Sequence, residues 1–376
     1  MDTLSALPGS VAPDIAQAAL AFFPDLTEVA SIAGRPDLVR VSAPSGVWRV
    51  RRWPEGTPES DVAFSHDVMR LARGAGLKTV PDLFTPSQSM DGASRIANRQ
   101  FDAQRWLPGA PPALAESAWP GPDDRIDMPA ALPRDQFAGI ITSLGRLHEG
   151  TIALAATAGI PTVPLHLLPG AVREAQARHL GSLRSKARHE PTIQRWISMG
   201  DRLLEQADPI ILAATLDREM PETVLHLGLW PAHVLIDNGE VSGLLGWERV
   251  AAGSPLLDIA QATLHLQGWS DDAVETALGA YADVRELAPA ERRLLPAVAA
   301  LDAVATTGRL LEQTHAVKDT ARPPSALRAA IDMMLSSMAA IEQNLNVEPR
   351  KRRTWVRKEG QGRHRPQGGA PRERRR

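Results

Sequence analysis

Residues 225–260 read LHLGLWPAHVLIDNGEVSGLLGWERVAAGSPLLDIA, and this stretch decides the fold. Residues 234–236 form an apolar, β-branched run, and residues 241–245 are expected to return as the partner strand. Asp237-Asn238-Gly239 lies between them and supplies residues that tolerate positive φ, which predicts a β-hairpin. The loop before this hairpin and the residues after it would lie at one end of a small sheet. Chemistry could be assembled at that end.

The same stretch resembles the aminoglycoside phosphotransferase and choline-kinase-like family, whose fold is that of the protein kinases. The family pattern runs H-G-D-L-H-P-G-N-V-L, then a hairpin with a D-G or N-G turn, then I-D-W-E, then D-P-x-x-D-L-A. The scaffold of the pattern matches this chain at His226, Leu229, Pro231, Val234, Leu235, Asn238, Gly239, Trp247, Glu248, Pro255 and Asp258. The resemblance implies an α+β, two-lobed protein-kinase-like fold. We expect a small β-rich N-lobe over residues 1–107, a larger helical C-lobe over 108–345 and a disordered basic tail over 346–376.

The chemical positions of the family pattern are not matched. Gly228 stands where the family has its catalytic aspartate, His233 where it has a metal-binding asparagine, and Gly246 where I-D-W-E has its metal-binding aspartate. Phosphoryl transfer needs a carboxylate near the attacking hydroxyl and oxygen ligands for magnesium. Glycine supplies neither, and neutral imidazole suits zinc or copper better than magnesium. The three losses together predict a pseudoenzyme without a metal site, in which ATP and magnesium are implied only by the resemblance.

The N-terminal part predicts a hairpin from alternating runs at 38–41 and 47–53, which flank a Pro-Ser-Gly turn. In the resembling family, the second strand carries the basic residue that contacts the nucleotide phosphates. Arg51 is our candidate for that position, with Arg52 beside it. The alternative is that both arginines are solvated on an outward strand face.

Two further segments resemble parts of the family's nucleotide site. A helix is predicted at 59–74, and His66 and Asp67 are its candidates for the glutamate that pairs with the strand cation, so that an Asp67–Arg51 pair is conceivable. The segment 98–107 resembles the hinge strand that ends in W-x-P-G, which makes Trp106 a nucleotide-binding candidate. Glu248 completes the predicted nucleotide-binding set with Arg51, Arg52 and Trp106.

The C-terminal part is predicted to be mainly helical. After a linker at 108–134, helices are expected at 135–150, within 165–190, and at 191–207, 209–218, 256–268, 271–285, 290–315 and 324–345. His148 ends an L-x-R-L-H pattern and is predicted to be a hydrogen-bonded packing residue. In the catalytic-loop scaffold (His226, Pro231 and Asp258), His226 should pack beneath the loop. Asp258 should accept backbone hydrogen bonds near a helix start.

Composition bounds the class of protein. The chain has 376 residues, of which 43% are hydrophobic and 23% charged, as is ordinary for a globular protein. It has no cysteine, which excludes disulfides, cysteine-ligated zinc and thiol catalysis. No apolar run of about 18 residues and no signal-peptide pattern occurs, so we expect no membrane span and a cytoplasmic location.

Charge is distributed unevenly along the chain. Residues 350–376 hold twelve lysines and arginines against two glutamates, whereas the first 349 residues hold 30 basic and 42 acidic residues. The basic segment 350–376 cannot bury apolar surface and is expected to be disordered. It could bind a nucleic acid or an anionic partner, with Trp355 available to stack on a base, or it could simply keep the protein soluble.

Three functions therefore compete. The first is a pseudoenzyme that binds a small molecule, a nucleotide or a partner in the interlobe cleft. The second is an active ATP-dependent small-molecule kinase that recruits another carboxylate, for which Glu248 lies nearer than the hairpin residue Asp237. The third is an adaptor that binds nucleic acid through residues 350–376. A transition-metal site made of His233 and Glu248 is a weaker alternative, because it has only two plausible ligands.

Overall fold

The computed structural model describes residues 11–32, 35–84, 93–96, 98–112, 130–156, 160–216, 221–316 and 325–346. The chain divides into a compact unit of Met1–Asn346 and a second unit of Val347–Arg376, which lies outside the described residues together with the predicted tail. The strands are β1 (Glu28–Ile32), β2 (Arg35–Ala43), β3 (Gly46–Arg52), β4 (Ala93–Ile96), β5 (Arg99–Arg105), β6 (Thr162–Val163), β7 (Thr223–Leu225), β8 (Val234–Asp237), β9 (Glu240–Leu244) and β10 (Ala251–Gly253). The α-helices are α1 (Pro13–Phe22), α2 (Glu59–Gly74), α3 (Arg134–Ala155), α4 (Leu168–Leu183), α5 (Pro191–Leu216), α6 (Leu256–Leu266), α7 (Asp271–Ala282), α8 (Pro289–Ala316) and α9 (Ser325–Asn346).

The N-terminal region is built on an antiparallel sheet of order β1-β2-β3-β5-β4. The predicted hairpin at 38–53 is present as β2 and β3, and Gly46 adopts a φ of 122° at their turn. The predicted hinge strand is β5, which pairs with β3 along its length. The sheet therefore places β3 and β5, which carry the candidate residues, next to each other.

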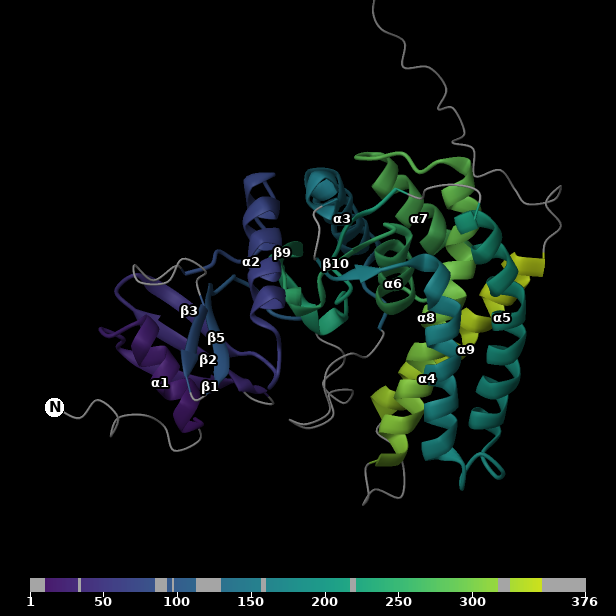
Figure 1. The fold of residues 1–376 in the computed structure, drawn as a ribbon, viewed down its shortest axis with the longest axis horizontal. Coiled ribbons are helices and arrows are strands. Elements are labelled where there is room, and N and C mark those ends of the chain that lie inside the picture. The colour runs from purple at the N-terminus through teal and green to yellow at the C-terminus, as the bar shows by residue number, and fades with distance from the viewer. Residues whose placement is uncertain are drawn as a thin grey trace, which may run out of the picture. The chain divides into compact units, whose positions relative to one another are not determined.

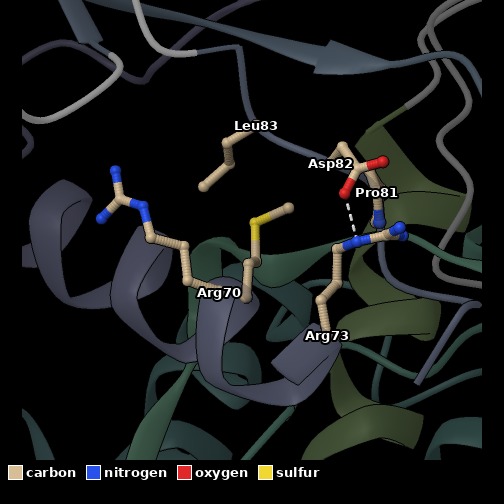
Figure 2. Close-up of a pocket in the computed structure, with 6 residues that line it drawn as sticks. Arg70, Arg73, Pro81, Asp82 and Leu83 are labelled. Atoms are coloured by element: carbon tan, nitrogen blue, oxygen red, sulfur yellow. Dashed lines mark ion pairs between the residues drawn. The ribbon is translucent and has the colours of Figure 1, made fainter. Parts of the chain in front are cut away.

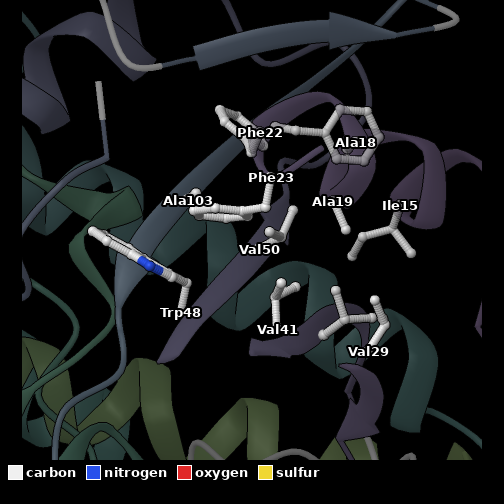
Figure 3. Packing of buried hydrophobic residues seen from close by; sticks show 12 residues of the cluster. Ile15, Ala18, Ala19, Phe22, Phe23, Val29, Val41, Trp48, Val50 and Ala103 are labelled. Carbon is white, nitrogen blue, oxygen red and sulfur yellow. The ribbon is translucent and has the colours of Figure 1, made fainter. Parts of the chain in front are cut away.

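One face of this sheet is apolar and is covered by α1. Side chains from alternate positions of β2, β3 and β5 point to this face and pack with Phe22 and Phe23 of the helix end, as Figure 3 shows. Phe23 stacks on Trp48 with ring centroids 5.5 Å apart. In Figure 1, α1 lies alongside the strands that it covers. Burial of this cluster fixes the register of the strands, because a shift by one residue would turn its members to the other face.

The opposite face carries polar residues, and we call it the arginine face. It is formed by Leu38 and Arg40 of β2, Arg49 and Arg51 of β3, and Asp102 and Gln104 of β5, which the strand register sets side by side. Most of these polar side chains are buried: Arg49, Arg51, Asp102 and Gln104 are all less than 9% exposed. A sheet with two buried faces of such different chemistry must satisfy its charges internally.

The hairpin predicted from 225–260 is present as β8 and β9, with Asn238 and Gly239 at positive φ in the turn. The segment after β5 runs antiparallel beside it, since Ala110 and Ile236 exchange backbone hydrogen bonds of 3.1 and 2.8 Å. Gly109 has a φ of 92°, and a Cβ at this position would lie 2.5 Å from the Ile236 carbonyl oxygen. The glycine of the W-x-P-G match thus allows the two segments to approach each other.

The C-terminal region packs around α8, which contacts α4, α5, α6 and α9 (Figure 1). By length and composition, Pro289–His315 could cross a membrane, but 78% of its apolar window is buried within the fold. Burial on this scale is what the central helix of a helical core requires. We therefore interpret α8 as the core helix of this region.

One prediction for the helical region was wrong. Separate helices were expected on either side of residue 208, but α5 runs unbroken from Pro191 to Leu216 with Pro209 inside it. Proline removes one backbone donor, but burial of the apolar side chains on both sides of it holds the helix together. The helix expected within 165–190 is present as α4, which follows a 3₁₀ turn at Leu165–Leu167 and ends at Leu183.

Candidate functional site

The loop before β8 is held by Asp258, in the first turn of α6. Its carboxylate accepts hydrogen bonds from the backbone nitrogens of His226 and Leu227, at 2.6 and 2.8 Å. Both bonds confirm the predicted role of Asp258. They hold Leu227 at a φ of 53°, a conformation that a leucine rarely adopts.

His148 of α3 supports the same carboxylate and is fully buried, as predicted for a packing residue. Its Nε2 lies 3.1 Å from Asp258 Oδ2, and its Nδ1 lies 2.9 Å from the Tyr281 hydroxyl. A carboxylate only accepts, so Nε2 donates to Asp258. Burial acts to raise the pKa of Asp258, but the hydrogen bond and charge of His148 outweigh it and hold that pKa below the ordinary value.

His226 lies beneath the loop, as predicted. It is fully buried and packs edge-on against Trp247, with ring centroids 4.6 Å apart. Its Nδ1 accepts a hydrogen bond of 3.2 Å from the Gly228 nitrogen. Burial lowers the pKa of His226 to about 4, so the ring is neutral at pH 7. Pro231 is buried and begins the 3₁₀ turn Pro231–His233, which leads into β8.

The three altered chemical positions lie in contact with one another. The imidazole of His233 packs directly on Gly246, so that a Cβ on Gly246 would lie 2.9 Å from Cε1 and 3.0 Å from Cγ of that ring. The His233 Nδ1 is 2.6 Å from the Gly228 carbonyl oxygen. A Cβ on Gly228 would in turn lie 2.7 Å from the Gly246 carbonyl oxygen. His233 therefore fills the space into which a side chain at position 246 would project.

This arrangement does not fit a magnesium site. Gly246 adopts a φ of 89°, which disfavours aspartate, and the histidine ring stands where a carboxylate would have to be. Within the described ranges, no three histidine, aspartate or glutamate side chains come together as metal ligands. At positions 228, 233 and 246 the chain therefore offers no carboxylate or amide ligand for magnesium.

Arg51 is the centre of a second, buried network on the arginine face. Its guanidinium donates to Asp102 Oδ2 at 2.7 Å and to Glu248 Oε2 at 2.9 Å. It also lies over the Trp53 ring, with Cζ 3.9 Å from the centroid. The structure thus brings together two of the predicted nucleotide-binding residues, Arg51 and Glu248, but joins them to each other.

Among the described residues, the donors to the Asp102 carboxylate are all side chains. In addition to Arg51, its donors are Trp53 Nε1 at 2.9 Å, His66 Nε2 at 3.1 Å and Gln104 Nε2 at 3.3 Å. Burial acts to raise the pKa of Asp102, but the charge of Arg51 and the bond to His66 hold it well below the ordinary value. The same competition between burial and Arg51 lowers the pKa of Glu248 to about 2. Both carboxylates are therefore ionised at pH 7.

Other predicted residues lie elsewhere. Arg52 points to the other face of β3, where it pairs with Asp14 at 3.0 Å. Trp106 follows β5 with its side chain 37% exposed and carries the Arg40 guanidinium 5.6 Å from its ring centroid. The suggested Asp67–Arg51 pair was wrong: Asp67 is exposed and pairs with Arg70 one turn later. His66, the other candidate on α2, faces inward to Asp102 instead.

Four buried residues of this face were not predicted from the sequence: Asp102, Trp53, Gln104 and Arg49. A signal for Asp102 was present, because an aspartate between Phe101 and Ala103 in a central strand is rarely buried without a partner. The partner could not be read from the sequence, since it depends on which strand pairs with β5.

A cavity of about 310 Å³ lies away from this network, between α2 and the segment before β4 (Figure 2). Its lining residues are Met69, Arg70, Arg73, Pro81, Asp82 and Leu83. Arg73 pairs with Asp82, as the dashed line in Figure 2 marks, and Arg70 pairs with Asp67. The charges of this cavity are therefore neutralised in pairs, and none of the predicted site residues lines it.

Comparison with known proteins agrees with this architecture. The aminoglycoside phosphotransferase from Alicyclobacillus acidocaldarius is 16% identical with a TM-score of 0.62, and the match covers 89% of this chain and 97% of that chain. The spectinomycin phosphotransferase APH(9)-Ia, solved with ADP and spectinomycin, is 10% identical with a TM-score of 0.55, covering 87% and 97%. A thermostable mutant of the aminoglycoside phosphotransferase APH(4)-Ia, in ternary complex with ADP and hygromycin B, is 12% identical with a TM-score of 0.55, covering 88% and 99%.

These likenesses show a shared fold. No match is found among curated proteins. The model of the phosphotransferase enzyme family matches residues 29–297, which include β2, β3, β5, the loop before β8 and α6. With its β-sheet N-terminal region and helical C-terminal region, the chain belongs to the phosphotransferase enzyme family and has the protein-kinase-like fold.

Proposed function

We propose that this protein is a catalytically silent phosphotransferase homologue that binds a small molecule without transferring phosphate to it. The observation that carries the proposal is the packing of His233 on Gly246, beside Gly228. Positions 228, 233 and 246, at which the resembling family has its base and metal ligands, are in direct contact with one another. Simple loss of a side chain would leave a gap there, whereas here a histidine ring occupies the space.

The chemistry of the reaction supports this reading. Phosphoryl transfer relies on positioning and charge stabilisation, which magnesium ions and their oxygen ligands supply. A general base typically contributes about 10²–10⁴-fold in rate, and Gly228 has no side chain to act as one. His233 Nδ1 already lies 2.6 Å from the Gly228 carbonyl oxygen, so this nitrogen is engaged within the loop.

An active enzyme that recruits Glu248 is a weaker proposal. Glu248 is bonded to Arg51 at 2.9 Å, and its pKa of about 2 makes it a poor proton acceptor at neutral pH. A single carboxylate would also have to serve as both the base and the metal ligand. The geometry therefore favours a silent site over an unconventional active one.

The binding part of the proposal rests on the preserved scaffold. The loop before β8 is still held in a defined conformation by Asp258, His148 and His226. The carboxylate of Asp258 is kept fully buried for this purpose. Relatives with this fold were solved with ADP, spectinomycin or hygromycin B. We infer from these relatives that the ligand of this chain is also a small molecule.

The test is an assay of the full-length protein for magnesium-dependent ADP formation from ATP, with and without a panel of aminoglycosides. We expect no turnover above that of heat-treated protein. The matched comparison is the triple variant G228D/H233N/G246D, which restores the residues of the family pattern and removes the ring that blocks position 246. Turnover by the natural chain would overturn the proposal, and turnover by the triple variant alone would support it.

Thermal-shift titration separates the remaining alternatives. A ligand that binds only the folded state raises the melting temperature. A shift with ATP that requires magnesium would contradict the proposal, because it would show that metal coordination survives. Salt-sensitive binding of RNA or DNA that disappears when residues 350–376 are removed would support the adaptor function instead.

A further inference from the structure

The cavity between α2 and the segment before β4 has walls that the rest of the fold holds in place. On one side, residues 82–84 run beside β5, where the Phe84 nitrogen donates to the Ala103 oxygen at 2.8 Å. On the other side, α2 is fastened by Ser65, whose hydroxyl donates to the Trp247 oxygen at 2.8 Å. Because both walls are fixed, the cavity is pre-formed, as sites for small molecules usually are.

The lining of this cavity combines apolar groups with guanidinium groups. Met69 is fully buried and forms the apolar part of the lining together with Pro81 and Leu83. Arg70 and Arg73 lie on opposite sides of the cavity, as Figure 2 shows. A molecule in the cavity would therefore touch hydrocarbon, one thioether sulfur and two guanidinium groups.

The charges around the cavity favour an uncharged occupant. Arg73 pairs with Asp82, and its Nη1 also donates to the Val80 oxygen at 2.5 Å. Arg70 pairs with Asp67 at 2.8 Å. An anion would have to compete with these two carboxylates, and a cation would meet two arginines. The pairing thus leaves neither sign of charge in demand.

The two guanidinium groups also offer flat surfaces that no aromatic ring of the described residues covers. Elsewhere in the described chain, arginines do lie over indole rings: Arg40 over Trp106, Arg51 over Trp53, Arg105 over Trp48 and Arg309 over Trp230. A guanidinium is attracted to the face of a ring, and a methionine sulfur also contacts rings favourably. The cavity therefore offers an aromatic ring contacts that a saturated ring of the same size could not make.

We propose that this cavity binds a small, uncharged aromatic molecule, with its ring on Met69 and between the guanidinium groups of Arg70 and Arg73. The cavity volume of about 310 Å³ is at the lower end of the range for small-molecule sites. This site is separate from the loop before β8, so it does not rest on the proposed function. An occupant would join α2 to the edge of the sheet and hold this helix, which bonds to Asp102 through His66, more firmly in place.

The experiment is a calorimetric titration of the full-length protein with 2-naphthol and with decahydro-2-naphthol. The two molecules share a hydroxyl group and two fused rings, but only the first is aromatic. We expect saturable binding of 2-naphthol that is about fivefold tighter, or more, than binding of the saturated analogue. Amide hydrogen exchange of the same protein should become slower in α2 and in residues 82–84 when 2-naphthol is bound.

Two variants test the lining, and a third serves as the control. R70M removes one guanidinium at a partly exposed position, so 2-naphthol should bind about threefold more weakly while the saturated analogue is unaffected. L83W supplies a ring from the chain itself, so it should abolish binding and raise the melting temperature. R173M is the matched control: Arg173 is also a partly exposed helical arginine paired with an aspartate, Asp208, and it does not line the cavity. Its affinity for 2-naphthol should equal that of the wild-type chain.

Three results would overturn the proposal. One is equal affinity for 2-naphthol and its saturated analogue, which would make the cavity merely apolar. Another is unchanged binding of 2-naphthol in both L83W and R70M, which would place the ligand elsewhere. The third is the absence of saturable binding. Circular dichroism checks folding, and R70M alters a partly exposed side chain, so it keeps the test open if L83W does not fold.

The two proposals fail separately. Turnover in the ADP-formation assay would overturn the silent site but leave the aromatic site intact. Equal binding of the two naphthol compounds, without turnover, would overturn the aromatic site alone.

Discussion

Two fully buried aspartates organise this molecule in different ways. Asp258 in the helical region accepts its two shortest hydrogen bonds from backbone nitrogens of the loop before β8. The carboxylate of Asp102 in the sheet has donors of another kind: within the described part of the chain they are all side chains, from β3, α2, β5 and the residue after β3. Asp258 therefore fixes a chain path, whereas Asp102 neutralises a charged surface. The two backbone bonds to Asp258 could form whatever side chains the loop residues carried. The bonds to Asp102 require the particular side chains that surround it.

Removal of Asp258 should have the largest effect. In D258A, two backbone N–H groups and His148 lose their acceptor inside the protein, and we expect the free energy of unfolding to fall by about 3–5 kcal/mol. Urea denaturation followed by circular dichroism measures this change. Since two of the three stranded donors belong to the backbone, a second substitution at His148 should recover only a small part of the loss. A loss of unfolding free energy in D258A that is smaller than the loss in D102A would contradict the proposed difference between the two aspartates.

Removal of Asp102 should cost less and should be recoverable. Arg51 keeps Glu248 as a partner, so we expect D102A to lose about 2–4 kcal/mol. The double variant D102A/R51M also removes the stranded cation, and we expect it to regain about 1–2 kcal/mol in the same denaturation experiment. Additive losses in the double variant would contradict the idea that Asp102 serves mainly to neutralise Arg51.

Stability should depend on pH in two separate ranges, one set by His226 and a lower one set by the buried aspartates. The pKa of His226 is about 4 in the folded protein and 6.5 ordinarily. The unfolded chain therefore binds more protons between these values, and stability falls as pH drops from about 6.5 to 4, by roughly 2–3 kcal/mol. H226Q should flatten this part of the curve. Asp102 and Asp258 have lowered pKa values, so their contribution is lost only below pH 3.8.

The measurement is the free energy of unfolding from urea titrations at pH 3–8, for the wild-type chain, H226Q and D102N. A slope between pH 6.5 and 4 that survives in H226Q would assign it to another histidine. In D102N, that slope should be unchanged, and only the limb below pH 3.8 should become shallower.

The smallest effect is expected at the neighbour of Arg51. Arg52 pairs with Asp14, and both side chains are about one-fifth exposed. Partly exposed ion pairs contribute about 0–1 kcal/mol, so R52M should change the free energy of unfolding by no more than that. R51M, one residue earlier on the same strand, strands Asp102 and should cost clearly more. Equal effects of the two variants would show that burial of the network adds nothing.

The fold was predictable because the sequence resembles a known family over residues 225–260. Three local signals carried the prediction: the Asn238-Gly239 turn, the proline and glycine of the hinge, and the carboxylate at 258. The structure contains the element that each of them predicted. The helix boundary at Pro209 was not predictable, because tertiary packing overrides the cost of one missing donor.

The site was predictable only in part, because strand pairing decides it. Arg51 and Arg52 are indistinguishable in the sequence, and the alternation of β3 sends one to Asp102 and the other to Asp14. Likewise, Asp102 comes within reach of Arg51 only because β5 lies next to β3. The lack of a carboxylate at position 228 could be read from the glycine itself, but the filling of the space by His233 required the structure.

The contact between His233 and Gly246 also bears on how such a protein could change in evolution. An aspartate introduced at position 246 alone would collide with the histidine ring, and asparagine introduced at 233 alone would leave a gap but no metal ligand beside it. The packing of one ring on one glycine thus couples positions 233 and 246, so that a change at either one alters the space available to the other. Under the proposed function, a return to the family pattern would therefore require both changes together.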